Sequence, residues 1–584
     1  GAVIEDIYNP ALIGDVITEE EIWACTTCRN CEDQCPVMIE HVSHVIDLPA
    51  RLARGPTHIE YSASEALPKL AWLATLDSEQ IRLTVLHGVA VECRPNFMVE
   101  GVWDGPFEAG EFHAGAHLFG SGIRLDHGTT YFVPSAALVD RLVYCRDGGK
   151  LLVSNSLVTL LAATGARLDP SHDYLVEAKA MLAGLDRYDT AFHVLHPTID
   201  RFHQIYHEVF TVTDGSMERK RTIAAREFRS FDDYHEMLRD RLAAICANAM
   251  DPARRMPLAT FGTLSTGYDS TAIAALIKDL GVRRYFTYVG AWGTKTANQP
   301  EYETAPIAAA LEIEPIRIQS PSAPDPEDEL LLRAASPLGH QIPLLAMASY
   351  VEQDAAVAAV FTGFHGDMVW DVNVPDEAVS EAIIRHDVSG IDLSELRLKS
   401  GFINIAVPFL YAASIKSIVA LSRSAEMKPW KLGTGYDRPI SRRIVEGAGV
   451  PRDRFGFLKG GIFGGGNRPT SPELRARYLD YVRRPGPPLP LFYARLTLDY
   501  YTMRLLARTG RIAKRKLRAN KIAATLRKLY RGFNDGYSWY GKRNHRSALY
   551  VWASMELVAK LRAHGIGAPS ADSIQPTGVS VALN

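Results

Sequence analysis

Four cysteines stand close together near the start of the chain. Cys25, Cys28, Cys31 and Cys35 are followed by Pro36, which gives the C-x2-C-x2-C-x3-C-P spacing of bacterial ferredoxins. Thiolates at this spacing can ligate the irons of a cubane, so the stretch predicts a [4Fe-4S] cluster. Structural zinc is a competing interpretation, although the final Cys-Pro pair favours a cluster. A stretch that binds no metal is the third interpretation.

The fourth iron ligand is open to two interpretations, because the chain has no second motif of this kind. It is either Cys35 or one of the three remaining cysteines, Cys93, Cys145 and Cys246. Residues 23–31 and 36–41 resemble the iron-sulfur domain of heterodisulfide-reductase-like oxidoreductases. Seven cysteines in 584 residues are too few for a disulfide framework.

A second candidate site is the turn of residues 265–270, which lies between an apolar run and a helical pattern. Its chemistry-bearing residues are Ser265, Thr266, Gly267, Asp269 and Ser270. Such a turn presents backbone N–H groups and a helix N-terminus to an anion such as pyrophosphate. Asp269 is placed to hold Mg²⁺ against those phosphates. Ser/Gly turns with a capping Asp or Ser are also common in structural connections.

These six residues resemble the Ser-Gly-Gly-x-Asp-Ser signature of the PP-loop ATP pyrophosphatases, with Thr266 in place of the first Gly. Residues 286–290 resemble the adenine-side strand of the asparagine synthetase family. That resemblance implies that Leu264 and Val289 contact adenine.

Two further segments extend the resemblance to residues 255–465. Residues 362–367 resemble the family's second loop, Ser-Gly-Glu-Gly-x-Asp, so Thr362 and Gly363 are expected at the nucleotide. Residues 450–459 are similar to the segment that carries the catalytic lysine, here Lys459.

The resemblance implies an ATP-dependent ligase with ATP and Mg²⁺ as cofactors. Asp269 and Asp367 would hold Mg²⁺, and a substrate carboxylate would attack the α-phosphorus to form an acyl-adenylate. Lys459 would stabilise developing charge while an amine or ammonia forms the amide. AMP and pyrophosphate would leave.

The chain departs from the family at the second loop. Phe364 stands in place of the Glu and His365 in place of the neighbouring Gly. His365 is a candidate base, although a packed histidine is a comparable interpretation. Either Glu301 or Glu303 is expected to serve nearby.

Hydrophobic patterns predict an α/β protein with four regions. Residues 236–470 alternate strands and helices, which indicates the parallel sheet of a PP-loop (adenine nucleotide α-hydrolase-like) synthetase domain. Residues 1–75 form the iron-sulfur module, and residues 471–584 form a helical, basic C-terminal region. We expect strands at 82–89, 130–133, 258–264, 285–289 and 316–318, and strand structure over 142–153 that is interrupted by the Asp-Gly-Gly turn of residues 147–149. Helices are expected at 230–249, 271–280 and 303–311.

Residues 76–235 are β-rich and resemble a degenerate glutaminase domain, notably at residues 149–157. Glutamine-dependent members of the family use an N-terminal cysteine, whereas this chain begins with Gly1. We therefore expect no glutaminase activity, and free ammonia or an amine as the nitrogen donor. A β-rich scaffold without this ancestry is the alternative.

Composition narrows the class of protein. The net charge is -3 and hydrophobic residues make up 47%, which is typical of a globular protein without a general affinity for nucleic acid. With no apolar run of membrane-spanning length and no secretion-like N-terminus, we expect a cytoplasmic location and no membrane contact.

The expected partners are a small-molecule carboxylate and an amine, a redox or amine-donating protein, and a second copy of the chain. One rival function is an iron-sulfur PP-loop sulfur transferase that acts on tRNA and binds its phosphates through the basic stretch 504–531. The other is a catalytically inactive binding protein that senses nucleotide or redox state. Four closely spaced cysteines argue against the transferase, which needs an iron open to sulfide.

Overall fold

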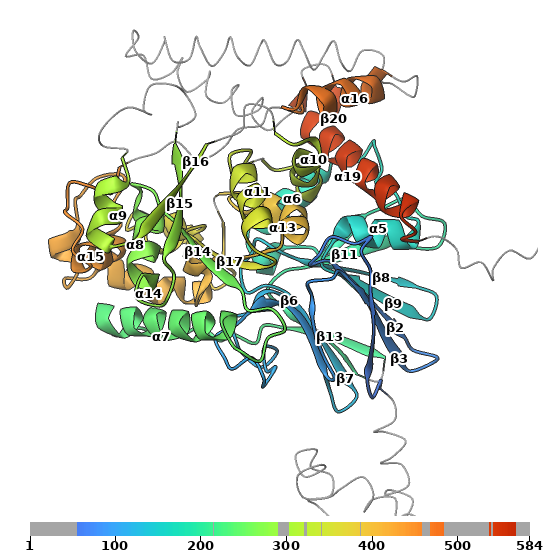
Figure 1. The fold of residues 1–584 in the computed structure, drawn as a ribbon, viewed down its shortest axis with the longest axis horizontal. Helices are drawn as coiled ribbons and strands as arrows, with labels where there is room; N and C mark the ends of the chain where they lie inside the picture. Colours follow the sequence, from blue (N-terminus) through green and yellow to red (C-terminus); the bar gives the residue numbers. More distant parts are fainter. Residues whose placement is uncertain are drawn as a thin grey trace, which may run out of the picture.

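The computed structural model describes residues 55–213, 215–289, 303–319, 324–339, 341–385, 387–457, 468–483, 537–538 and 541–567. The chain first builds two stacked β-sheets and then a parallel sheet flanked by helices (Figure 1). No helix in these ranges is both long and apolar enough to cross a membrane.

The first two sheets form a β-sandwich. One contains, in spatial order, β1 (Ile59–Ala63), β3 (Arg82–His87), β2 (Trp72–Asp77), β9 (Lys150–Ser154), β8 (Leu142–Asp147), β11 (Arg201–Ile205) and β10 (Ala191–His193). The other contains β13 (Ser216–Lys220), β12 (Val209–Thr213), β7 (Thr129–Val133), β6 (Phe119–Asp126), β5 (Phe97–Val102) and β4 (Glu92–Arg94). Side chains from the facing sides of the two sheets interdigitate, so Trp72 and Leu142 from one sheet meet Met98 and Phe132 from the other in a buried cluster.

The third sheet is the expected parallel one. Its order is β16 (Glu314–Gln319), β15 (Arg284–Val289), β14 (Ala259–Thr263), β17 (Ala358–Thr362) and β18 (Phe402–Ala406), and every pairing is parallel. All five residues of β17 and of β18 are buried, as strands covered on both faces require.

Helices cover both faces of this sheet. Those around it are α7 (Phe231–Ala249), α8 (Tyr268–Ile277), α9 (Ala305–Leu311), α10 (Pro326–Ala335), α11 (Leu344–Asp354), α12 (Gly366–Val369), α13 (Ser394–Ser400), α14 (Ile415–Arg423) and α15 (Pro439–Gly447). Figure 1 shows α8 and α9 on one side of the strands and α11 and α13 on the other. Right-handed crossovers produce this arrangement, because β15 and β16 are added in one direction from β14, and β17 and β18 in the other.

The change of direction at β14 is the feature that positions a site. β14 pairs directly with β17, with Gly262 opposite Phe361. The loops that follow these two strands therefore emerge side by side at the carboxyl edge of the sheet, where ligands of open α/β sheets bind.

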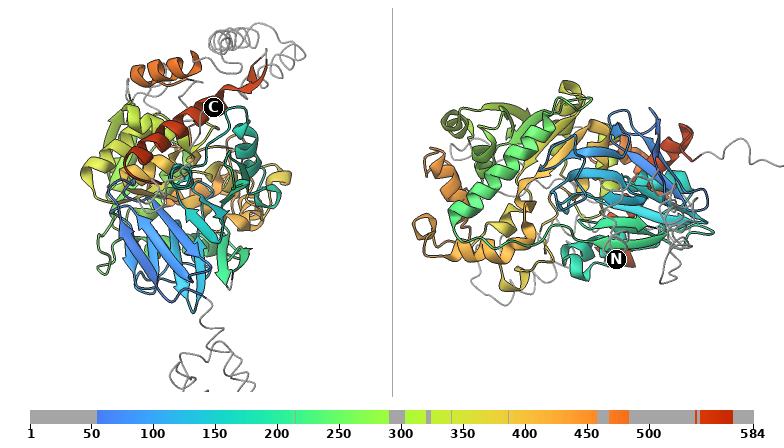
Figure 2. Two further views of the ribbon diagram at one scale, coloured as in Figure 1. Left: turned by 90° about the vertical axis from the view of Figure 1, so that its right-hand side faces the viewer. Right: turned by 90° about the horizontal axis from the view of Figure 1, so that it is seen from below.

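Helices near the C-terminus pack back onto the earlier parts of the chain. α19 (His545–Ala563) contacts α10 and also α5 (Leu157–Thr164), and α16 (Pro472–Arg483) lies beside α19 (Figure 2, left). A short hairpin, β19 (Tyr537–Ser538) and β20 (Gly541–Asn544), precedes α19. The right-hand view of Figure 2 shows α7 running along the underside of the molecule.

Two expected boundaries fall inside secondary structure. The sandwich begins at Ile59, and β2 spans the boundary expected between residues 75 and 76. The boundary at residue 235 lies within α7, which begins after Ser230, whose side chain accepts a hydrogen bond from Asp233 N. The first two strands are short, so their alternation gives a weak signal in the sequence.

Buried charges join the sandwich to the parallel-sheet part. Arg397 on α13 donates to Glu100 on β5 at 2.7 and 3.1 Å and to Asp140 at 2.7 Å. Next to it, the Glu395 carboxylate accepts from Ser156 Oγ at 2.7 Å and from Leu157 N at 3.0 Å. All these titratable side chains are essentially inaccessible to water, so each depends on its hydrogen-bond partners.

We expect Arg397→Met to destabilise the protein strongly, because it leaves the Glu100 and Asp140 carboxylates buried without their cation. Removing one partner of a buried ion pair costs about 3–5 kcal/mol. Chemical denaturation would measure the change in the free energy of unfolding. Arg82→Met is the control, since Arg82 pairs with Glu60 on the surface and such pairs contribute less than about 1 kcal/mol. Equal effects of the two substitutions would contradict the prediction.

Candidate active site

The turn of residues 265–270 connects β14 to α8 and is held by its own hydroxyl groups. Ser265 Oγ lies 2.5 Å from Ser270 Oγ and accepts a hydrogen bond from Gly267 N at 3.1 Å. Thr271 Oγ1 donates to the carbonyl oxygens of Ser265 and Gly267, both at 2.6 Å. Gly267 is the N-cap residue of α8 and has no side chain to cap the helix. The first N–H groups of α8 are therefore suited to an anion.

Thr266 ties this turn to the segment that leads toward Lys459. The Thr266 side chain is buried, while its carbonyl oxygen accepts from Gly456 N at 2.8 Å and from Phe457 N at 3.2 Å. Gly456 has φ +83°, and a Cβ there would lie 2.7 Å from the Tyr268 ring. The structure thus places the approach to residue 459 against the turn, whereas Lys459 itself lies outside the described residues.

The second loop, residues 362–367, rests directly on Asp269. A Cβ on Gly363 would come within 2.8 Å of Asp269 Cβ, and one on Gly366 within 2.5 Å of Asp269 Cγ. Both positions therefore require glycine. Thr362 lies behind them at the end of β17, with Oγ1 donating to Asn404 Oδ1 at 2.8 Å. The structure brings the two loops together as expected from the sequence.

His365 occupies a backbone position that favours glycine. Its φ is +76°, in the left-handed region, where the resembled family has Gly. The ring is 1% exposed and stacks on Phe409 with centroids 4.5 Å apart. Its role as a base stays a prediction.

Asp269 and Asp367 belong to a group of four carboxylates with Asp371 and Asp387. The Asp269 carboxylate accepts a hydrogen bond from the Arg438 guanidinium, whose Nε lies 3.9 Å from Asp371 Oδ2. Asp387 pairs with Arg385 at 3.0 Å. The four acids therefore share two arginines, Arg385 and Arg438.

Crowding of these acids perturbs their pKa values. Burial, followed by the charges of Asp387 and Asp269, raises the pKa of Asp367 to about 7. Burial also raises the pKa of Asp269, although the Arg438 guanidinium opposes the shift. Burial acts on Asp387 as well, but Arg385 and Ser389 hold its pKa below the usual range. Such perturbed carboxylates are typical of functional sites.

The carboxylates do not form a complete metal site by themselves. Within the described ranges, no three His, Cys, Asp or Glu side chains are arranged to hold a metal ion. Mg²⁺, however, is commonly bound through one or two carboxylates together with substrate phosphates and water. The donor chemistry of Asp269 and Asp367, next to a helix N-terminus, fits a Mg²⁺ ion that arrives with phosphates.

The two residues expected at adenine lie at the ends of neighbouring strands, Leu264 just after β14 and Val289 as the last residue of β15. Leu264 N donates to Phe286 O at 2.8 Å, and the Leu264 side chain is 2% exposed. Val289 ends β15, beside Gln319. Glu303 is largely exposed and 3.6 Å from Arg317, whereas Glu301 lies outside the described residues.

The cysteine cluster, Cys25, Cys28, Cys31 and Cys35, also lies outside the described residues. The three other cysteines are free and separated: Cys93 on β4, Cys145 on β8 and Cys246 in α7. Cys93 Sγ lies 3.6 Å from His87 Nε2.

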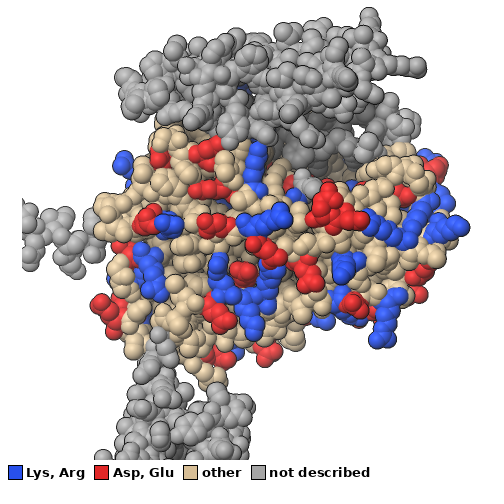
Figure 3. Space-filling model, turned by 180° about the vertical axis from the view of Figure 1, so that it is seen from behind, with Lys and Arg blue, Asp and Glu red and all other residues tan. Residues whose placement is uncertain are grey.

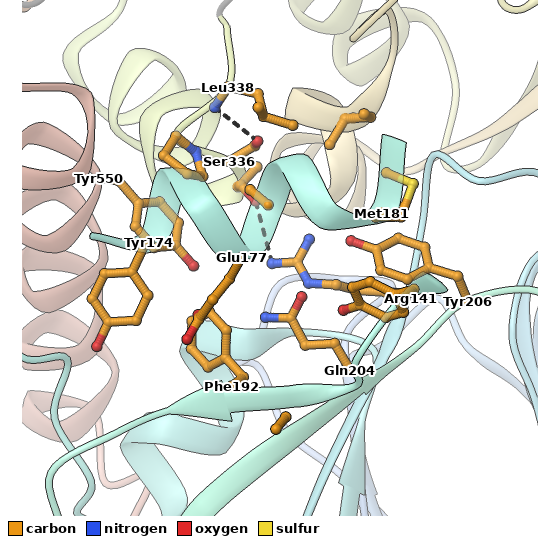
Figure 4. Close-up of a pocket in the computed structure, with 16 residues that line it drawn as sticks. Arg141, Tyr174, Glu177, Met181, Phe192, Gln204, Tyr206, Ser336, Leu338 and Tyr550 are labelled. Atoms are coloured by element: carbon orange, nitrogen blue, oxygen red, sulfur yellow. Dashed lines mark hydrogen bonds between the residues drawn. The ribbon is translucent and has the colours of Figure 1, made fainter. Parts of the chain in front are cut away.

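A cavity elsewhere is too small for a substrate. It lies where β10 and β11, α6 (Tyr174–Leu182) and α19 meet, and has a volume of about 20 Å³, enough for roughly one water molecule. Figure 4 shows the Arg141 guanidinium in it near Gln204 and Tyr206; this group donates to Ala335 O at 3.2 Å. None of its lining residues belongs to the two loops.

Sequence reasoning missed Arg438, Asp371 and Asp387. Arg438 is 169 residues from Asp269 in the chain, and no motif spacing links the two. Its one local signal is the following Pro439 at the start of α15, which marks a helix N-terminus and not a site.

Comparisons with known proteins concern a short N-terminal stretch. No family model matches the chain. Over 63 residues, 11% of this chain and 9% of the relative, it is 62% identical to "Probable iron-sulfur-binding oxidoreductase FadF" of Bacillus subtilis. Over 54 residues, 9% of this chain and 7% of the relative, it is 40% identical to "EtfAB:quinone oxidoreductase" of Syntrophomonas wolfei. Over 37 residues, 6% of each protein, it is 46% identical to "Probable membrane-anchored ferredoxin" of Chromohalobacter salexigens.

The chain thus spans less than a tenth of the length of each of these relatives. The expected resemblance of the N-terminal segment to iron-sulfur oxidoreductases is confirmed. The resemblance of residues 255–465 to asparagine synthetases stays a prediction.

The raised pKa of Asp367 predicts a pH-dependent stability. An unfolded Asp has a pKa near 3.9, so the folded protein holds this proton more tightly. The stability contributed by the proton is fully present below about pH 4 and is lost as the pH rises through 7. In metal-free buffer, the wild type should lose on the order of 2 kcal/mol of its free energy of unfolding as the pH rises, and we expect Asp367→Asn to remove this loss.

Urea unfolding at pH 5 and pH 8 would measure this difference between variant and wild type. Asp376→Asn is the control, because the Asp376 side chain is 86% exposed. Parallel pH profiles of Asp367→Asn and the wild type would show that the prediction is wrong.

Proposed function

We propose that the chain is an ATP-dependent ligase that adenylates a carboxylate and forms an amide with ammonia or an amine, releasing AMP and pyrophosphate. A PP-loop synthetase domain would carry this reaction, and an N-terminal [4Fe-4S] module would precede it. The supporting observation is the contact between the two predicted loops, in which Gly363 and Gly366 leave just enough room for the Asp269 side chain.

The position of this contact supports nucleotide binding. Both loops follow adjacent parallel strands at the point where the sheet changes its direction of growth. The N-terminus of α8 would receive the pyrophosphate end of ATP, and the Ser265 and Ser270 hydroxyls lie beside it. Asp269 and Asp367 would hold the accompanying Mg²⁺, which neutralises phosphate charge.

The reaction then needs little covalent chemistry from the protein. A carboxylate oxygen of the substrate attacks the α-phosphorus, and the bond to pyrophosphate breaks. The amine nitrogen next attacks the activated carbonyl carbon, loses a proton and displaces AMP. Lys459 would stabilise the developing negative charge, and His365 would accept the amine proton.

The sandwich is proposed to act without glutaminase chemistry. Burial raises the pKa of the Cys93 and Cys145 thiols to about 12 each. Neither cysteine is therefore a thiolate at neutral pH, as a cysteine nucleophile requires. Nitrogen would come from free ammonia, an amine substrate or an amine-donating protein.

The surface does not favour a nucleic-acid partner on the face shown in Figure 3, where Lys and Arg side chains alternate with Asp and Glu. We propose a cytoplasmic enzyme that acts on small molecules, self-associates and receives a redox protein at its N-terminal module.

We expect pyrophosphate and AMP release to depend on a carboxylate substrate and to fall about 100-fold or more in Asp269→Asn, because Mg²⁺ and phosphate positioning are lost. A pyrophosphate-release assay with a panel of carboxylates and ammonia measures this. Asp279→Asn, a largely exposed carboxylate on the surface, should leave the rate unchanged.

Two results would contradict the ligase. Turnover that requires tRNA but no carboxylate would indicate sulfur transfer, and silence with every substrate would indicate a binding protein.

We further propose that Cys25, Cys28, Cys31 and Cys35 ligate a [4Fe-4S] cluster, as the names of the N-terminal relatives support. Anaerobic purification should yield about four irons per chain and a broad visible absorption band. Cys28→Ser should lose most of the iron, whereas Cys246→Ala, which alters a buried thiol of α7, should retain it. Stoichiometric zinc in place of iron would refute the cluster.

A further inference from the structure

We propose that Arg438 is an exchange residue: it neutralises Asp269 in the nucleotide-free protein and transfers to the pyrophosphate end of ATP when Mg²⁺ takes Asp269. This inference rests on the proposed nucleotide site and adds a positioning residue that neither loop motif contains.

The placement of the Arg438 side chain is the first observation. It is 6% exposed and contacts the Asp269 carboxylate, while its Nε has no hydrogen-bond partner within the described part of the chain. Its Cζ lies 4.9 Å from the centre of the Tyr436 ring. A guanidinium buried to this degree normally uses all its donors, so the unused Nε is available to an incoming acceptor.

The charge of the site is the second observation. Asp269, Asp367, Asp371 and Asp387 face Arg385 and Arg438, and these six described groups interact electrostatically. Four carboxyl groups thus face two guanidinium groups, and a divalent cation would offset this excess of acidic groups.

Mg²⁺ on Asp269 Oδ1 and the Arg438 guanidinium on Oδ2 would repel each other across one carboxylate, which favours movement of the guanidinium to another anion. Asp269 Oδ1 already lacks a hydrogen-bond partner among the described residues. When Mg²⁺ binds there, the guanidinium needs another anion, and phosphate oxygens at the start of α8 are the nearest chemistry that suits its forked geometry.

The backbone on which Arg438 stands is fixed, so only the side chain has to move. Its carbonyl oxygen accepts from Arg442 N at 3.0 Å, and Pro439 begins α15. On the other side, the Asp437 carboxylate holds Leu432 N and Gly433 N at 2.7 and 2.8 Å, and Asp437 O accepts from Val372 N. Rotation of a long side chain on a rigid base is faster and less costly than a loop rearrangement.

Two binding measurements on the full-length protein test this exchange. In the first, Mn²⁺ alone is titrated and followed by electron paramagnetic resonance; in the second, pyrophosphate is titrated calorimetrically at saturating Mg²⁺. We expect Arg438→Gln to bind Mn²⁺ about tenfold more tightly, because its competitor is gone, and pyrophosphate about tenfold more weakly. Arg443→Gln, which removes a charge from α15, the helix that follows Arg438, should change neither affinity.

Arg438→Lys supplies a second readout if the glutamine variant does not fold. It keeps the charge and loses the fork, so Mn²⁺ affinity should stay at the wild-type level while pyrophosphate binding weakens. If Arg438→Gln binds both Mn²⁺ and pyrophosphate more weakly than the wild type, the contact of Arg438 with Asp269 is a purely structural salt bridge and the exchange is wrong. Unchanged affinities, or no binding of either ligand by any variant, would also overturn the exchange. If Arg438→Gln binds Mn²⁺ more tightly and pyrophosphate more weakly, but the wild type shows no carboxylate-dependent turnover, the proposed ligase function is wrong and the exchange is supported.

Discussion

The parallel pairing of β14 with β17 is the constraint on which the candidate site depends. It brings the loops after the two strands so close that the Asp269 side chain lies against the backbone of Gly363 and Gly366. A side chain at either glycine would displace the carboxylate. The position of Asp269 therefore follows from sheet topology and from two missing Cβ atoms more than from its own hydrogen bonds. Everything proposed about phosphate and metal starts from this contact.

Electrostatics at that contact explain why an arginine from a distant helix is present. Carboxylates crowded at a buried sheet edge are unstable without cations, and Arg438 and Arg385 supply them in the ligand-free protein. Burial, followed by the charges of Asp387 and Asp269, nevertheless raises the pKa of Asp367. A folded protein that tolerates such an imbalance is typical of a site that completes its charge with a ligand.

The local elements of this fold were predictable, and the long-range contacts were not. The apolar stripe of α7 and the Asp-Gly-Gly turn between β8 and β9 identify their elements through spacing alone. The alternation of strands and helices also predicted the parallel sheet, and the family resemblance led us to expect the two loops at one site. Arg438, by contrast, reaches Asp269 only through the tertiary structure. The left-handed backbone conformation of His365 is uncommon for a residue other than glycine. Neither leaves a pattern in the sequence.

The buried contact of Arg397 with Glu100 and Asp140 makes the parallel-sheet part dependent on the sandwich. The sandwich supplies the anions that a cation of the parallel-sheet part needs in a dry interior. A shortened gene lacking these strands would encode a protein with a bare guanidinium at a newly exposed apolar surface, prone to aggregate. The parallel-sheet part therefore relies on the sandwich for its own solubility, whatever chemistry either part performs.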